Sequence, residues 1–260
     1  MPELPEVESY RVVAERALRR KIAEVVADDA WFLKRDTTSA MLHEALVGTE
    51  LEATRRVGKL LLLDIAGGGV LGLHFGMSGT LLVDEEPNTQ QLSYSGHRIA
   101  PEWDRFSLRF NDGGTLRLND ARRLGGVELD PNETRLGPDA LSLTLGVLRE
   151  QLSTSSAPLK ARLMDQARVA GVGNLIADEA LWRAGLDPAR LANSLDETEL
   201  KRLQRVLRKT INDLIFRGGS HTGDLMEVRH VGGRCPKDGA ELIRRKVGGR
   251  TTYSCPEHQV

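Results

Sequence analysis

The spacing of apolar residues divides the chain into three stretches of different character. The first apolar residues recur at the spacing of one helix face and predict an amphipathic helix; they are Val7, Tyr10, Val13, Ala14, Ala17 and Leu18. Further on, LLLLDIAGGGVLGLHF predicts two strands joined by a glycine turn. The segment RFSLRFNDGGTLRLND alternates around an N-D-G-G turn and predicts a hairpin. This stretch therefore favours antiparallel β-structure with one helix in front and a second, short one over 41–47.

The pattern becomes helical near Pro138 and stays so to Arg217, as in ETELKRLQRVLRKTINDLIF. After Gly218 and Gly219 the tail is short, basic and rich in glycine, and it contains both cysteines of the chain. We therefore expect an α+β protein in three parts. An N-terminal antiparallel β-sandwich flanked by helices covers 1–135, a helical domain covers 136–220, and a β-hairpin module covers 221–260.

Composition and charge narrow the classes of protein that fit. The 260 residues are 40% hydrophobic and 28% charged, which is typical of a globular chain. The net charge of −1 weighs against a nucleic-acid partner, but 225–260 holds seven Lys or Arg against four Asp or Glu, which allows a local basic face. The N-terminus is acidic and no apolar run is long enough to span a bilayer, so we expect a cytoplasmic protein without membrane contact.

The two cysteines begin similar short segments, CPKD and CPEH. Two residues separate Cys235 from Asp238 and Cys255 from His258, and sixteen residues lie between the pairs. This spacing indicates a tetrahedral structural zinc site, because thiolate, imidazole and carboxylate all bind zinc. A metal-free hairpin is one alternative. A site in which a histidine replaces Asp238 is another, and the candidates for it are His221 and His230.

With these parts in place, the chain resembles the formamidopyrimidine-DNA glycosylase and endonuclease VIII family of base-excision repair enzymes. The matching segments run almost from end to end in the family's order: PELPEVE, RRVGKLLLL, HFGMSG, NDARRLGG, LKARLMDQARVAGVGNLIADEALWRAGLDPARLANSL and VGGRTTYSCPEH. The resemblance implies a β-sandwich domain, a helix–two-turns–helix domain and a zinc-finger hairpin, with the active site in a cleft between the two main domains. It also implies a DNA glycosylase and abasic-site lyase that acts as a monomer on double-stranded DNA with oxidised bases.

The same resemblance gives the catalytic residues. Removal of Met1 leaves Pro2 with a secondary amine, which attacks the sugar C1′ and forms a Schiff base as an iminium. Glu3 is the implied acid and base, and Glu6 orders the opened sugar or a water. Lys59, expected on a strand of the sandwich, contacts phosphate and helps the base to leave.

The implied DNA contacts belong to two groups. Met77 and Leu124 are apolar residues suited to filling the gap that a flipped nucleotide leaves, and Arg122 reaches the orphaned partner base. Asn174 and Arg250 bind the phosphates that flank the lesion, with Lys160 as a further candidate for that surface.

Three features depart from the family pattern. Asp238 and His258 stand where the family's finger usually has cysteines, and Leu124 stands where the formamidopyrimidine branch usually has phenylalanine. The segment from Gly219 to Cys235 is shorter than in that branch, and the missing length corresponds to the loop over a flipped 8-oxoguanine. We therefore expect weak activity on 8-oxoguanine, with formamidopyrimidines and oxidised pyrimidines as alternative substrates.

Two other classes of function are alternatives to this interpretation. A catalytically silent damaged-DNA-binding protein on the same scaffold would explain the basic tail, but not the combination of Pro2, Glu3, Glu6 and Lys59. A tautomerase that uses an N-terminal proline as a general base would place Pro2 ahead of a strand, whereas here a helix is predicted to follow.

Overall fold

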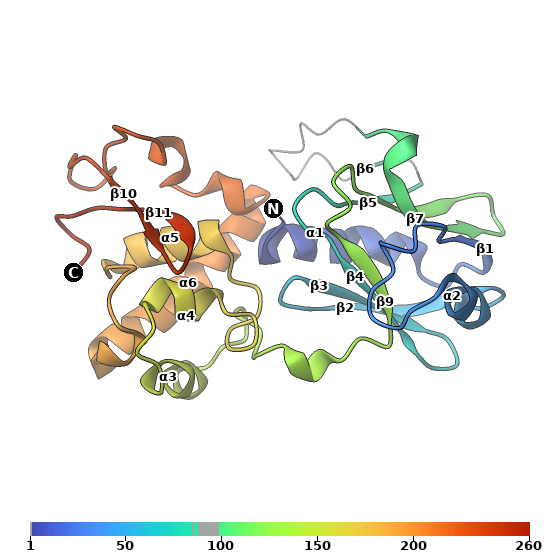
Figure 1. The fold of residues 1–260 in the computed structure, drawn as a ribbon, viewed down its shortest axis with the longest axis horizontal. Helices are drawn as coiled ribbons and strands as arrows, with labels where there is room; N and C mark the ends of the chain where they lie inside the picture. The colour runs from blue at the N-terminus through green and yellow to red at the C-terminus, as the bar shows by residue number, and fades with distance from the viewer. Residues whose placement is uncertain (1, 85, 88–98) are drawn as a thin grey trace. The chain divides into compact units, whose positions relative to one another are not determined.

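The computed structural model describes residues 2–84, 86–87 and 99–260, and these form two compact units (Figure 1). The first unit is Glu6–Glu133 together with Pro2. The second unit is Thr134–Val260 together with Glu3–Pro5. The first residues of the chain are therefore shared between the two units.

The first unit contains two antiparallel sheets with short helices around them. Its helices are α1 (Leu4–Ala14), α2 (Ser39–Leu46) and the 3₁₀ turns Glu15–Ala17 and Pro101–Trp103. One sheet has the order β1-β7-β8-β5-β6, with β1 (Ile22–Val26), β5 (Thr80–Val83), β6 (Glu86–Pro87), β7 (Asp104–Phe110) and β8 (Thr115–Asn119). The other has the order β2-β3-β4-β9, with β2 (Leu51–Val57), β3 (Leu60–Ile65), β4 (Val70–His74) and β9 (Gly126–Leu129).

Both predicted hairpins of this unit are confirmed. β3 pairs with β4 from Leu60↔His74 to Asp64↔Val70, and β7 pairs with β8 around the N-D-G-G turn. One apolar core joins the two sheets and α1, because Leu63 of β3, Leu108 of β7 and Val7 of α1 belong to the same buried cluster. The unit is therefore the sandwich that the alternation of apolar residues predicts.

The second unit is helical and ends in a β-hairpin. Its elements are α3 (Leu145–Ser153), α4 (Leu159–Met164), α5 (Asn174–Ala184), α6 (Glu197–Arg217), β10 (Ile243–Val247), β11 (Arg250–Ser254) and 3₁₀ turns at Glu133–Arg135, Ala192–Ser194, Ser220–Thr222 and Met226–Val228. α6 begins at a capping box formed by Asp196 and Glu199 and ends at Gly218, which has a φ of 94°. Polar start and glycine stop signals thus set the limits of this helix.

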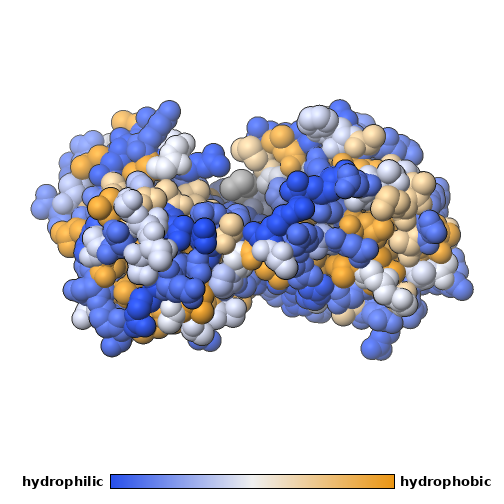
Figure 2. All heavy atoms as spheres, turned by 60° about the horizontal axis from the view of Figure 1, so that its bottom comes forward, coloured by the Kyte–Doolittle hydropathy of each residue, from blue (hydrophilic) through white to orange (hydrophobic). Residues whose placement is uncertain are grey.

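The visible surface is mostly hydrophilic, with apolar side chains scattered over it (Figure 2). In the part of the chain that the structure describes, no helix combines the length and the apolar character needed to cross a bilayer.

Candidate active site and metal centre

The N-terminus of α5 holds the carboxylate of Glu3. Its two oxygens accept hydrogen bonds from the backbone N–H groups of Leu175 (2.9 Å) and Ile176 (3.1 Å), and the side chain is 1% exposed. A Cβ at Gly173 would lie 2.1 Å from the Glu3 carboxyl carbon, so a side chain at position 173 would displace this carboxylate. The GVG segment ahead of α5 therefore makes room for an acidic side chain, which uses the free N–H groups of the helix start.

The predicted catalytic lysine lies in a turn and not on a strand. Gly58 and Lys59 connect β2 to β3, and Gly58 has a φ of 59°, which favours glycine. Arg56 holds this turn in place, because its guanidinium donates to the Gly58 carbonyl and to Glu8 of α1, both at 2.9 Å. The expectation of a strand position for Lys59 is wrong because the glycine reverses the chain one residue earlier.

The other predicted catalytic residues lie at the start of the chain. Pro2 is buried, and Glu6, in the first turn of α1, is fully buried as well. Within the first unit, α1 thus carries Glu6 and, through Glu8 and Arg56, anchors the turn of Lys59. The predicted roles of Pro2, Glu6 and Lys59 remain predictions.

Two loops of the first unit present the predicted wedge residues. Met77 lies between β4 and β5 and is 43% exposed, and Leu124 lies between β8 and β9 and is 46% exposed. Arg122 is exposed in the same loop as Leu124. Asp120, fully buried, binds the loops together, since its carboxylate accepts from the Ser78 hydroxyl and from the backbone N–H groups of 122 and 125.

Tyr10 of α1 anchors both ends of the Met77 loop. Its ring packs on Phe75 with centroids 4.4 Å apart, and its hydroxyl donates to the Gly79 carbonyl at 3.2 Å. Burial raises the pKa of the Tyr10 phenol, so the hydroxyl keeps its proton and acts as a donor. Helix α1 therefore fixes the bases of two predicted site loops.

Two of the predicted phosphate contacts lie at element ends in the second unit. Asn174 is the first residue of α5, where backbone N–H groups favour anions, and its buried side-chain oxygen has no hydrogen-bond partner among the described residues. Arg250 is exposed at the start of β11, next to the two-glycine turn of the β10–β11 hairpin. A Cβ at Gly248 would lie 2.6 Å from that of Ala161, so this turn lies tightly against α4.

Lys160 does not lie on a surface, which corrects its prediction as a phosphate contact. The side chain is 0% exposed, and its ammonium lies 2.6 Å from Asp178 Oδ1 and 2.7 Å from Thr252 Oγ1. Arg229 binds the other oxygen of Asp178 at 2.9 Å and also donates to the Thr251 carbonyl. Lys160 is therefore a buried ion-pair partner that joins α4 and α5 to β11, the strand on which Arg250 lies.

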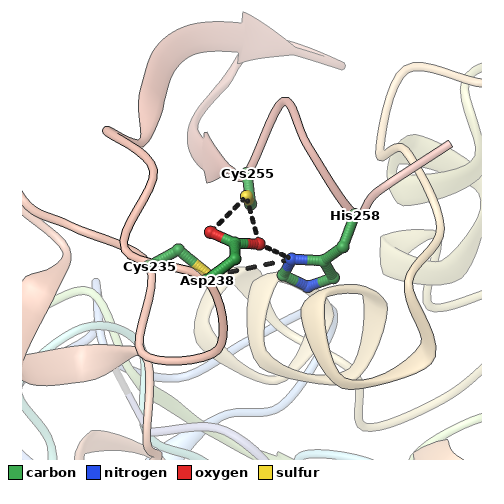
Figure 3. A group of neighbouring side chains, drawn as sticks. All are labelled: Cys235, Asp238, Cys255 and His258. Carbon is green, nitrogen blue, oxygen red and sulfur yellow. Dashed lines mark hydrogen bonds and ion pairs between the residues drawn. The ribbon is translucent and has the colours of Figure 1, made fainter.

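The four predicted metal ligands point toward one another (Figure 3). One donor atom from each of Cys235, Asp238, Cys255 and His258 lies within 4.8 Å of all the others. In a tetrahedral zinc site with bonds of about 2.3 Å to sulfur, donor atoms lie about 3.8 Å apart, so the four residues are close to that geometry. The alternatives His221 and His230 are not part of this cluster.

Contacts around the cluster also fit a metal ion. His258 Nε2 lies 3.1 Å from the Trp182 carbonyl, which directs the ring so that Nδ1 faces the other donors. Cys235 Sγ accepts hydrogen bonds from the Trp182 indole and from the Lys237 backbone N–H, at 3.3 and 3.4 Å. Such donors stabilise a thiolate, the form of cysteine that binds metals.

Without a metal, burial raises the pKa of the Cys255 thiol, while a hydrogen bond from the Ala240 backbone and another from His258 lower the pKa of Asp238. The two shifts have opposite effects on anionic charge, since the first disfavours a thiolate and the second favours a carboxylate. A divalent cation would stabilise both anions, and the donor set therefore fits zinc.

Several residues of these sites were not found from the sequence. Asp120 and Asp178 carry much of the local hydrogen bonding, and Trp182 supplies both an indole donor and a carbonyl to the metal cluster. Asp120 follows a strand end within NDARRLGG, a position typical of a side chain that binds turn N–H groups. The partners of Asp178 lie 18 or more residues away in sequence, so local pattern offered no signal for it.

Comparisons with known proteins agree with this arrangement. Residues 1–127 match the family model of the formamidopyrimidine-DNA glycosylase N-terminal domain, and residues 136–225 match that of the formamidopyrimidine-DNA glycosylase H2TH domain. The formamidopyrimidine-DNA glycosylase of Paracoccus denitrificans is 36% identical, covering 98% of this chain and 99% of that protein. The enzyme of the same name from Thermus thermophilus is 37% identical, covering 100% and 98%.

Solved structures of the Lactococcus lactis Fpg protein have the same fold. Its complex with a FAPY-dG containing DNA aligns with a TM-score of 0.83 at 28% identity, over 99% of both chains. Its complex with an abasic site containing DNA aligns with a TM-score of 0.82 at 27% identity, again over 99% of both. Sequence identity above 30% over nearly the whole length, together with this shared fold, shows that the chain belongs to the formamidopyrimidine-DNA glycosylase family.

Proposed function

We propose that the protein is a DNA glycosylase of base-excision repair that removes oxidised bases from duplex DNA and then cleaves the abasic site as a lyase. The observation that carries the proposal is the fixed position of Glu3, the residue next to Pro2 in the chain. Two backbone N–H groups at the start of α5 hold its carboxylate. A carboxylate held in this way, one residue after the proposed amine nucleophile, supports a role for Glu3 as the acid and base of covalent catalysis.

The amine of Pro2 is the nucleophile once Met1 is removed. Its nitrogen forms a bond to C1′, the N-glycosidic bond breaks, and the base leaves with the bonding electron pair and takes up a proton. Glu3 protonates the sugar ring oxygen, so that the ring opens and an iminium forms between Pro2 and C1′. Glu6 orders the opened sugar or a water, and Lys59 contacts phosphate beside the reacting nucleotide.

The lyase step follows from the iminium. Loss of a proton from C2′, taken up by Glu3, breaks the C3′–O bond and releases the 3′ phosphate. Water then hydrolyses the iminium and frees the Pro2 amine. Met77 and Leu124 fill the space of the flipped nucleotide and Arg122 reaches the orphaned partner base, while Asn174 and Arg250 bind the flanking phosphates.

We infer one structural zinc ion held by Cys235, Asp238, Cys255 and His258. When bound, zinc supplies folding free energy to the hairpin module and takes no part in the reaction. The module of residues 221–260 is proposed as a distinct part of the protein that presents Arg250 to DNA, beside the catalytic sandwich (1–135) and the helix–two-turns–helix domain (136–220).

The substrates proposed are formamidopyrimidines and oxidised pyrimidines, with weak activity on 8-oxoguanine. The support is the short connection from α6 to Cys235, which contains two 3₁₀ turns, Ser220–Thr222 and Met226–Val228. Relatives support both lesion classes, because Lactococcus lactis Fpg has been solved with FAPY-dG and with an oxidised pyrimidine in DNA.

Borohydride trapping tests the mechanism on three duplexes, which carry an abasic site, 8-oxoguanine opposite cytosine, or an oxidised pyrimidine. Reduction of the iminium links protein to DNA, so we expect adducts on the abasic and pyrimidine duplexes and a weak 8-oxoguanine adduct. Pro2→Gly and Glu3→Gln should lose base excision but keep affinity for damaged DNA. Excision at the native rate by either variant contradicts the mechanism.

The control for this experiment is the state of the N-terminus. Mass spectrometry must show that Met1 is absent, and a sample with a retained N-terminal tag should bind DNA without forming an adduct. If the processed protein binds DNA but forms no adduct on any duplex, the silent DNA-binding alternative replaces the enzyme.

A further inference from the structure

Trp31 is an exposed aromatic residue that none of the proposed roles uses. Its side chain is 70% exposed, although burying a side chain of this size is strongly favourable. A single exposed apolar residue needs no explanation, but Trp31 lies in a loop that is bound to the loop of Leu124. The contacts between these two loops, all within the first unit, fix the position of the Trp31 turn.

The turn of Trp31 is rigidly built. The backbone carbonyl of Asp29 accepts a hydrogen bond from the Phe32 backbone N–H at 2.8 Å. The Asp29 carboxylate accepts another from the Trp31 backbone N–H at 3.2 Å. The Lys34 ammonium donates to the Trp31 carbonyl at 2.8 Å. Phe32, the residue after Trp31, is fully buried and anchors the turn in the core, while the Trp31 indole is exposed to solvent.

The same turn is attached to the loop that carries Arg122 and Leu124. The guanidinium of Arg123 binds the Asp29 carboxylate through two nitrogens, and the Arg123 side chain lowers the pKa of that carboxyl. Backbone hydrogen bonds connect Phe32 and Lys34 to Val127 at 3.0 and 2.8 Å. The position of Trp31 is therefore fixed relative to the residues after the predicted wedge.

The glycines that follow Leu124 show how closely the two loops approach. A Cβ at Gly125 would lie 3.1 Å from the Phe32 ring, and one at Gly126 would lie 2.3 Å from the Lys34 side chain. Side chains of the Trp31 turn thus fill the space beside both glycines. Trp31 and Leu124 therefore lie in neighbouring loops of the first unit, and Asp120 binds the Met77 loop to that of Leu124.

From this geometry we propose that Trp31 is an additional DNA contact, whose indole stacks on a base or sugar face beside the step that Leu124 opens. The inference rests on the proposed function, because it needs DNA bound at this surface. A wedge that unstacks one base step exposes apolar faces next to it, and an indole packs on such faces whatever the sequence. The Lys34 ammonium, which lies 5.6 Å from the indole centroid, adds a cation near the phosphate of that nucleotide.

The test measures binding of an uncleavable duplex that carries a tetrahydrofuran abasic analogue. Stacking on an aromatic side chain contributes about 1–3 kcal/mol per base, so Trp31→Ala should weaken binding by about fivefold or more. Trp31→Phe should restore most of that affinity, because phenylalanine also stacks. The slope of log Kd against log salt should stay the same in both variants, since neither change removes a phosphate contact.

Fluorescence and kinetics separate a DNA contact from a structural role. Binding should quench the tryptophan emission of the native protein more than that of Trp31→Phe, which keeps only Trp103 and Trp182. Trp103 is partly buried in the first unit and Trp182 is buried in the second, so the difference between the two proteins reports on Trp31. Single-turnover cleavage at saturating enzyme should be nearly native in Trp31→Ala, since the indole does not touch the reacting atoms.

Phe216→Ala is the matched control, because Phe216 is an aromatic residue that is 92% exposed on α6, outside the proposed DNA contacts. We expect its Kd to be native. Native affinity and native quenching in the Trp31 variants would overturn the inference and leave the proposed function intact, and so would an equal loss in Phe216→Ala. Failure of the native protein itself to bind the duplex would overturn both.

Discussion

The β-sandwich of the first unit and the β10–β11 hairpin of the second are both antiparallel β-structure, but different forces stabilise them. In the sandwich, two sheets and α1 share one large apolar core. The hairpin belongs to a small cluster of buried residues, namely Trp182, Leu225, Cys235, Leu242, Tyr253 and Cys255. Two of these are metal-ligand candidates. A two-stranded hairpin cannot bury enough apolar surface on its own, so the hairpin depends on other interactions.

The hairpin is held by ion pairs and hydrogen bonds, several of them from side chains of helices α4 and α5. Asp178 of α5 binds Lys160 and Arg229, which both reach the backbone of β11, and the four-residue cluster closes the far end of the hairpin. The surface on which Arg250 lies therefore depends on buried charge and on the cluster proposed to hold a metal, whereas the loops of Met77 and Leu124 are supported by an apolar core.

The largest effect should follow removal of the metal. Because the hairpin has little core, chelation or Cys255→Ser should remove the metal and the amide protection of residues 229–260, while peptides of the sandwich stay protected in hydrogen exchange. Acid should act in the same direction, since protonated thiols and imidazole do not bind zinc. His230→Ala is the control, because this exposed histidine lies outside the cluster and its loss should leave the metal content unchanged.

Two results would contradict a metal-dependent hairpin. A freshly purified protein with well under one metal equivalent and full protection of residues 229–260 would show that the hairpin folds without zinc. Full protection of residues 229–260 in Cys255→Ser would show that the buried ion pairs suffice.

The next effect concerns Asp178. Asp178→Asn leaves the fully buried Lys160 without its anion, and breaking a buried ion pair costs about 3–5 kcal/mol. Denaturant unfolding should show this loss in the free energy of unfolding, and β11 should exchange faster than in the native protein. Glu197→Gln is the matched control, because the Arg149–Glu197 pair is about half exposed and such pairs contribute about 1 kcal/mol or less.

The smallest effect should come from the apolar core of the sandwich. Leu63→Ala leaves a cavity between the sheets, and we expect a loss of about 3 kcal/mol in the free energy of unfolding, with metal content and hairpin protection unchanged. Val47→Ala, at a side chain that is 41% exposed, should change stability by less than about 0.5 kcal/mol. Loss of metal from Leu63→Ala would contradict the independence of the two regions.

Local sequence determined most of the elements and the set of metal-ligand candidates. Alternation of apolar residues and glycine turns gave the strands β3, β4, β7 and β8, because these patterns act over a few residues. The capping signals at Asp196 and Gly218 set the limits of α6. Spacing alone selected the four metal-ligand candidates, and the structure brings those same four side chains together.

Only the tertiary structure decided which charged side chains are buried and which partners they bind. In the sequence Lys160 is one lysine in the helical segment LKARLM, but in the fold it is fully buried against Asp178. Lys59 was expected on a strand but lies in a turn, because Gly58 adopts a positive φ. Asp120 binds Ser78, which lies 42 residues earlier in the chain, and Arg123 binds the Trp31 turn through Asp29, so the local sequence indicates neither connection. Burial and long-range pairing are set by the whole fold, and a single sequence shows neither.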